Sequence, residues 1–217
     1  MTEPSRLEAI LGAVEASIRD PRAASDRAGF LAAQALDPRD EAAMTKLDDT
    51  AFLVYRKIIR RSLAGAIAVE LPRTAALLGD RFDEEVDAFL TEGLSASHYL
   101  RDVAFELVAR AAKSWPGDTT VPPFALDLAR HELSAFTVAS MPRRASAARV
   151  DASLDLDAPC VFDEAATLER YDYPIHELAE GQTELAPSPT ALLVYRDHEH
   201  EPRYLKLSPV AATLIER

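Results

Sequence analysis

Cysteine and glycine are scarce in this chain, and the shortage excludes several classes of protein. One cysteine, Cys160, rules out an intramolecular disulfide and any zinc site built from several cysteines. The seven glycines form neither the GxGxxG nor the GxxxxGK pattern, so the sequence has no glycine-rich phosphate loop. HExxH and GxSxG are also absent. The sequence therefore carries no motif of a nucleotide-binding enzyme, a zinc protease or a serine hydrolase.

Long apolar runs and positive charge are also in short supply. No run approaches the roughly 18–20 apolar residues of a membrane helix, although 48% of all residues are hydrophobic. The first residues lack a basic stretch followed by an apolar one, so we expect no secretory signal and a cytoplasmic protein. The 24 Lys+Arg stand against 36 Asp+Glu, a net charge of −12. This excess of acid disfavours binding to nucleic acids and to anionic membranes.

Proline is rare in the first half, where only four of the fourteen prolines precede residue 116. Because proline interrupts helices, the sequence predicts a mostly α, α+β protein: a helical bundle over residues 1–142 and a small β-containing domain over 150–217. The charge changes at the same place. Residues 1–150 carry 22 acids and 19 bases, a net of −3, whereas the rest carries 14 acids and 5 bases, a net of −9. Small, polar and basic residues at 140–149 indicate a linker.

Apolar residues at three- and four-residue spacing predict about six or seven helices in the first part. A long helix that starts near Phe52 must kink or end at Pro72. Gly79 is expected to cap a helix end, and Asp83 to open the next helix. The last helix of the bundle should begin at Pro122.

The second part shows strand-like patterns. Residues 150–156 alternate apolar and polar side chains and predict a half-buried strand, and residues 173–178 predict a short edge strand. Residues 191–196 and 203–207 flank a polar loop, which is typical of a hairpin. Ser208 and the proline after it are expected to cap a short final helix.

Three features could carry chemistry, and each also has a structural interpretation that we favour. His198 and His200 would share one face of a strand and could bind a metal ion, but nothing marks a third ligand, and a charged hairpin tip is the simpler explanation. Cys160 has no motif partner that would act as its base, so an inert buried thiol is expected. The remaining histidines taken as structural or interfacial are His98, His131 and His176. We therefore expect no catalytic residue, no resident metal and no cofactor.

The densest basic cluster spans residues 56–61. On a helix, Arg56 and Arg60 would share a face, with Lys57 and Arg61 beside them. This cluster could contact phosphates. Because the chain is acidic, pairing with its own second half or with an acidic partner surface is favoured instead.

Short motifs follow one another in a set order along most of the chain. They are Tyr55-Arg56, Leu71-Pro72, Leu77-Leu78-Gly79-x-x-Phe82, Phe89, Ser97-x-Tyr99-Leu100-Arg101-Asp102 and Pro123-Phe124-x-x-Asp127-Leu128-Ala129-x-x-Glu132. This order resembles the N-terminal domain of the HvfC/BufC type, which has long been labelled a DNA-binding domain. The later motifs are similar to the smaller C-terminal domain of that type: Tyr173-Pro174-Ile175-His176, residues 189–196 and Tyr204-x-Lys206-Leu207-Ser208-Pro209. The resemblance covers about residues 45–217, with Leu133 where the family often has an aromatic residue.

The resemblance implies a non-catalytic partner protein in RiPP biosynthesis, with a link to metal homeostasis. Its partner would be a TIM-barrel multinuclear iron oxidase of the BufB/MbnB type, which modifies cysteines of a ribosomally made precursor peptide. On this basis we expect partner contacts at Arg56, Arg60 and Arg101. We expect peptide contacts in the C-terminal domain at Tyr195, Arg196, Tyr204 and Lys206. The alternative is a DNA-binding transcriptional regulator that uses the helical domain.

The physical form of peptide recognition would be strand addition. An extended peptide can pair with an exposed sheet edge, where backbone hydrogen bonds supply affinity and side-chain pockets supply specificity. The candidate strands are residues 192–196 and 204–207. The alternative explanation is that these strands only close a small core.

Overall fold

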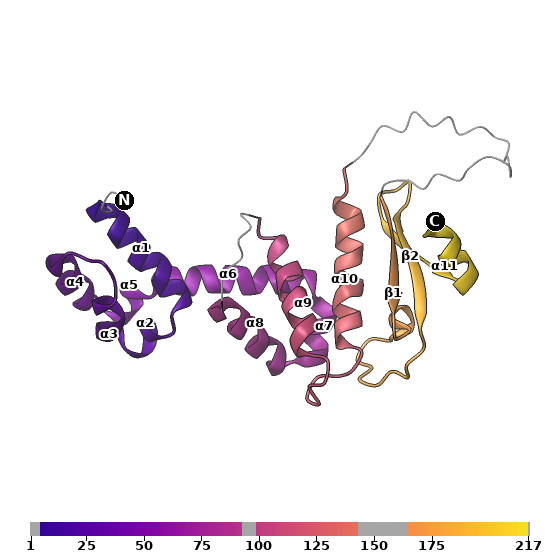
Figure 1. Ribbon diagram of the computed structural model, residues 1–217, viewed down its shortest axis with the longest axis horizontal. Coiled ribbons are helices and arrows are strands. Elements are labelled where there is room, and N and C mark those ends of the chain that lie inside the picture. The colour runs from indigo at the N-terminus through magenta and orange to yellow at the C-terminus, as the bar shows by residue number, and fades with distance from the viewer. Residues whose placement is uncertain (1–4, 93–98, 143–164, 217) are drawn as a thin grey trace. The chain divides into compact units, whose positions relative to one another are not determined.

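The computed structural model describes residues 5–92, 99–142 and 165–216, and the chain divides into two compact units (Figure 1). The first unit contains Met1–Val69 and Gly79–Arg110, and the second contains Glu70–Leu78 and Ala111–Arg217. The predicted fold class is confirmed, because helices make up the N-terminal part and a three-stranded antiparallel sheet follows them. Within the described ranges no strand precedes residue 115, and the last helix before the sheet ends at Ser140.

The first unit is built from helices, several of them short. They are α1 (Arg6–Arg19), α2 (Arg22–Ser25), α3 (Arg27–Ala32), α4 (Pro38–Thr45), α5 (Asp49–Phe52), α6 (Val54–Glu70), α8 (Asp80–Glu92) and most of α9 (Asp102–Ser114). The spacing of apolar residues predicted fewer helices because it does not register single-turn elements. The carboxylates of Asp26, Asp37 and Asp48 accept backbone N–H groups at the starts of α3, α4 and α5, so each short helix begins with its own cap.

The predicted break near Pro72 is confirmed. Helix α6 ends at Glu70, and Pro72 occupies the first position of α7 (Pro72–Leu78), where its missing N–H costs nothing. Gly79 follows with φ +54°, the left-handed conformation that favours glycine at a helix end. Helix α8 then begins at Asp80, three residues before the predicted start.

The second unit places a sheet between helices. Its elements are the end of α9, α7, α10 (Ala125–Ser140), β1 (Ala166–Tyr171), the 3₁₀ helix η1 (Ile175–Glu177), β2 (Thr190–Arg196), β3 (Pro202–Leu207) and α11 (Pro209–Ile215). The strand order is β1-β2-β3. The predicted hairpin is confirmed as β2 and β3, and Ser208 caps α11 by accepting the Ala211 N–H at 3.2 Å.

One strand was predicted in the wrong place. Residues 173–178 contain η1 rather than an edge strand, and the strand lies earlier, at β1. The Oδ2 atom of Asp127 accepts the backbone N–H groups of Asp172 at 2.7 Å and Tyr173 at 3.2 Å. These two donors are therefore directed at α10 instead of a neighbouring strand, and β1 ends at Tyr171.

Helices cover both faces of the sheet, as Figure 1 shows for α10 and α11. Val138 of α10 packs against Tyr171, Leu192 and Val194, all nearly or fully buried. Helix α11 contacts β2 and β3 through the buried Ala212. The sheet core is therefore completed by a helix that precedes it in the sequence.

Several predictions concern residues outside the described ranges, namely the strand at 150–156, most of the linker at 140–149, His98 and Cys160. The boundary between the predicted domains 1–142 and 150–217 falls in the same part of the chain and stays a prediction. The compact units are divided elsewhere, since α7 and α10 group with the sheet. None of the helices in the described ranges combines the length and hydropathy needed to cross a membrane.

Candidate functional site

Strand β3 is the accessible edge of the sheet. It pairs with β2 alone, and the hydrogen bonds of the described residues give its backbone no other partner. Residues 203–206 are all exposed, whereas β1, the opposite edge, is largely half-buried. An edge with unpaired backbone groups can accept another extended chain. The prediction that residues 192–196 could do so is wrong, because β2 is already paired on both sides.

Tyr204 provides an aromatic side chain on this edge. Its ring centroid lies 4.4 Å from that of His131 on α10, with the planes tilted by 34°. His131 in turn meets Tyr171 edge-on at 5.6 Å. These contacts hold one side of Tyr204 against α10 while 39% of the residue remains exposed. Tyr204 is therefore a partly exposed aromatic side chain whose position is held by α10.

His131 is buried, and burial keeps it neutral. The residue is 6% exposed, and its Nδ1 atom has no hydrogen-bond partner among the described residues. Burial lowers the pKa of His131 to about 4, and the charges of Arg73 and His176 act in the same direction. The imidazole beneath Tyr204 is consequently uncharged at pH 7.

The pKa of His131 predicts an acid-dependent loss of stability. A histidine with an ordinary pKa near 6.5 in the unfolded chain takes up its proton there first, so protonation favours unfolding. The free energy of unfolding should be at its full value above pH 6.5 and fall by up to about 3 kcal/mol as the pH drops to 4. Urea titrations of the wild type and His131→Phe across this range will test it. The variant keeps the aromatic contact with Tyr204 and should lose this part of the pH dependence. If the free energy of unfolding falls equally with pH in both proteins, His131 is not its source.

The other predicted peptide contacts divide between two strands. Lys206 pairs with Glu177 at 2.8 Å, and both side chains are 56% exposed. Because an exposed ion pair contributes little free energy, Lys206 can leave Glu177 for another carboxylate at low cost. Tyr204 and Lys206 share the face of β3 that looks toward α10, because they lie opposite Val194 and Leu192.

Tyr195 and Arg196 lie on the central strand instead. Tyr195 is half-buried. Arg196 donates to the carbonyl oxygens of Ala139 at 3.2 Å and Met141 at 2.7 Å, at the end of α10. The structure therefore brings Tyr204 and Lys206 together on the open edge and leaves the other two predicted contacts off it.

Two of the three arginines predicted to contact a partner have internal roles in the first unit. Arg56 donates to the carbonyl oxygens of Ser17 at 2.8 Å and Ile18 at 2.6 Å, at the end of α1. Arg60 bonds to Asp87 of α8 through both its carbonyl and its carboxylate. Arg101 remains 55% exposed in its side chain, beside Tyr99 and Asp102. Partner contact by these three residues stays a prediction, and two of them already serve the fold.

The acidic residues of the α10 motif also serve the fold. The Glu132 carboxylate accepts the backbone N–H of Arg73 at 2.7 Å, and the N–H and hydroxyl of Thr74 at 3.0 and 2.6 Å. It thereby caps α7 from another helix, as Asp127 caps the end of β1. Burial raises the pKa of both carboxyl groups. A sequence signal did exist for these roles, since Asp127, His131 and Glu132 are ionisable residues on a largely apolar helix.

The histidine pair at the hairpin tip is exposed. His198 and His200 lie in the turn between β2 and β3, where Arg203 and Asp197 form a 2.6 Å ion pair. Within the described ranges, no group of three or more His, Cys, Asp or Glu side chains is placed to hold a metal ion.

Together, the fold and the open edge define a small α+β module in which a helix supports a three-stranded sheet. Residues 164–217 match the family model of the HvfC C-terminal domain. This segment includes the whole sheet and α11, so the open edge lies within the part of the chain that matches this family model. The match supports the HvfC-type assignment that the ordered motifs indicated. A search of curated proteins found no relative that matches the chain.

Proposed function

We propose that this chain is a non-catalytic partner protein that binds a TIM-barrel multinuclear iron oxidase of the BufB/MbnB type. In this role it presents a ribosomally made precursor peptide for cysteine modification in the cytoplasm. The observation that carries the proposal is the open β3 edge within the segment that matches the HvfC C-terminal domain. The chain's own contribution is binding, and the oxidative chemistry belongs to the partner.

The geometry of β3 specifies how the peptide would bind. An added strand would alternate its side chains between the two faces of the sheet. On the α10 face it would meet Tyr204, which favours an apolar or aromatic peptide residue, and Lys206, which favours an acidic one. On the other face it would meet Leu205, which is 51% exposed and favours an apolar residue.

Tyr204→Ala is expected to weaken peptide binding at least tenfold. A well-packed aromatic contact at an interface is typically worth about 2 kcal/mol or more, and each 1.4 kcal/mol is a factor of ten. Isothermal titration of the precursor peptide into the full chain will measure the effect. Tyr55→Ala is the control, because Tyr55 is an aromatic residue of the first unit that is even more exposed than Tyr204, at 58% against 39%. Equal peptide affinity for the wild type and Tyr204→Ala would contradict the β3 site.

Strand addition itself can be tested through the peptide backbone. Methylating one backbone nitrogen at a time removes one N–H donor, and in a sheet only every second residue directs its donor at the neighbouring strand. Affinity should therefore alternate strong and weak along the paired segment. A peptide that binds as a helix would show no such two-residue period.

The helper role is tested by turnover. The oxidase should modify its cysteine-containing peptide faster when this chain is added, and the chain alone should leave the peptide unchanged. An oxidase that is fully active without the chain would disprove the proposal.

A further inference from the structure

Helix α6 carries apolar residues on two faces, one of them buried and the other exposed. Leu63 and Ile67 are buried, and their spacing of four residues places them on one face of the helix. Tyr55, Ile58 and Val69 are 58%, 56% and 76% exposed. A surface helix normally carries one apolar stripe, so the second needs an explanation.

The exposed residues form a continuous line along the helix. We call it the α6 stripe, and its members are Tyr55, Ile58, Ser62, Gly65 and Val69. Their spacing alternates between three and four residues, and at 3.6 residues per turn they cover about 80° of the helix. This alternation is the seam along which two helices pack. A Cβ atom on Gly65 would meet nothing within 4 Å, so this part of the stripe leaves room for a close neighbour.

Positive charge lies along one flank of the α6 stripe. Lys57 and Arg61 are exposed, and the described contacts give neither side chain a hydrogen bond or an ion pair. Arg56 and Arg60, by contrast, are engaged with α1 and α8. The free flank therefore matches a partner helix with acidic residues beside its own apolar seam. A second copy of this chain would bring the same cations, which disfavours pairing of α6 with itself.

We propose that the α6 stripe is the docking surface for an amphipathic helix with an acidic flank on the outside of the oxidase. This inference rests on the proposed function, because a TIM barrel presents a ring of outer helices. It separates the two tasks of the chain: α6 of the first unit binds the enzyme, and β3 of the second unit binds the peptide.

The test is isothermal titration of the full chain against the multinuclear iron oxidase encoded nearest to its gene. Ile58→Asp places an uncompensated charge in the seam and should raise Kd at least tenfold. Gly65→Leu should also raise Kd because it fills the space for the neighbouring helix, while its higher helix propensity should raise Tm. A variant that is more stable yet binds worse cannot be explained by misfolding. Leu214→Asp, on the exposed side of α11, is the matched control and should bind as the wild type does.

Each outcome has one meaning. The α6 stripe is supported if Ile58→Asp and Gly65→Leu bind the oxidase more weakly, Leu214→Asp does not, and the affinity for the peptide is unchanged in all three. If the wild type and both variants bind the oxidase equally, the stripe assignment is wrong and the proposed function stands. No binding by the wild type would disprove both. Self-association that Ile58→Asp abolishes, or duplex DNA binding that Lys57→Glu abolishes, would overturn the assignment in favour of another occupant.

Discussion

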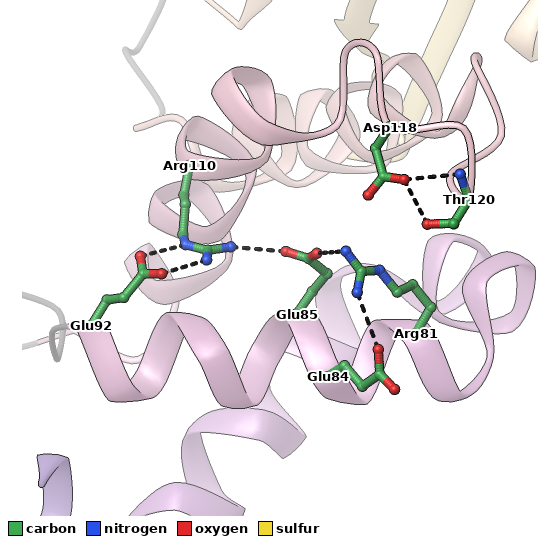
Figure 2. A network of polar contacts seen from close by, with 7 residues as sticks. All are labelled: Arg81, Glu84, Glu85, Glu92, Arg110, Asp118 and Thr120. Atoms are coloured by element: carbon green, nitrogen blue, oxygen red, sulfur yellow. Dashed lines mark hydrogen bonds and ion pairs between the residues drawn. The ribbon is translucent and has the colours of Figure 1, made fainter. Parts of the chain in front are cut away.

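Replacing Arg110 with methionine is expected to lower the free energy of unfolding by about 3 kcal/mol. Arg110 of α9 donates to Glu85 at 2.8 Å and forms two 2.7 Å hydrogen bonds to Glu92, both on α8 (Figure 2). Glu85 is only 5% exposed. Removing one partner of a buried ion pair leaves the other charge uncompensated and typically costs about 3–5 kcal/mol. The lower end applies here because Arg81 also contacts Glu85, at 2.7 Å.

Two further variants separate the buried contact from the surface contact. Glu92 is 64% exposed, so Glu92→Gln should cost less than about 1 kcal/mol even though it removes the charge and one of the two acceptor oxygens. Combining Arg110→Met with Glu85→Met should recover most of the loss, because no buried charge remains. Urea unfolding followed by circular dichroism at pH 7 will measure all four proteins. Equal losses for Arg110→Met and Glu92→Gln would show that burial of Glu85 does not control the effect.

Local signals account for the elements that the sequence predicted correctly. The end of α6 at Glu70 follows from Pro72, and the start of α11 follows from Ser208, whose side chain caps it. The sequence predicts the hairpin of β2 and β3 because two runs rich in apolar residues flank a polar loop. In each case the deciding interaction joins residues that are close in sequence.

Long-range contacts account for what the sequence could not predict. β1 was missed because its residues, Ala166–Tyr171, show no clear alternation and become a strand only by pairing with β2. Without β1, nothing in the sequence places β2 in the middle of the sheet, so the sequence alone leaves residues 192–196 as a possible edge. The internal role of Arg56 was equally hidden, since its acceptors on α1 lie 36–39 residues away in the sequence.

The stability of the sheet also depends on residues that are distant in the sequence. The match to the HvfC C-terminal domain begins at residue 164, after α10, yet α10 covers one face of the sheet. Leu192, Val194 and Ile175 are fully buried in the whole chain. Leu128 of α10 and Phe124, the residue just before this helix, pack with Ile175, and Val138 packs with the other two. Residues 164–217 alone would expose all of these contacts to water.

Residues 164–217 expressed alone are therefore expected to be unfolded. Each large apolar side chain that loses its burial costs about 1.5–3 kcal/mol, and a core this small rarely supplies more than about 3–5 kcal/mol in total. Residues 111–217, which restore α10, should regain the sheet, but with lower stability than the full chain because α7 no longer provides donors to Glu132. Circular dichroism and amide-proton spectra of the two pieces will distinguish these states. In the full chain, Val138→Asp should disrupt the same sheet, since Val138 is fully buried against Leu192 and Val194. A cooperative thermal transition in residues 164–217 alone would show that β1–β3 and α11 form a self-sufficient core, and that α10 merely covers it.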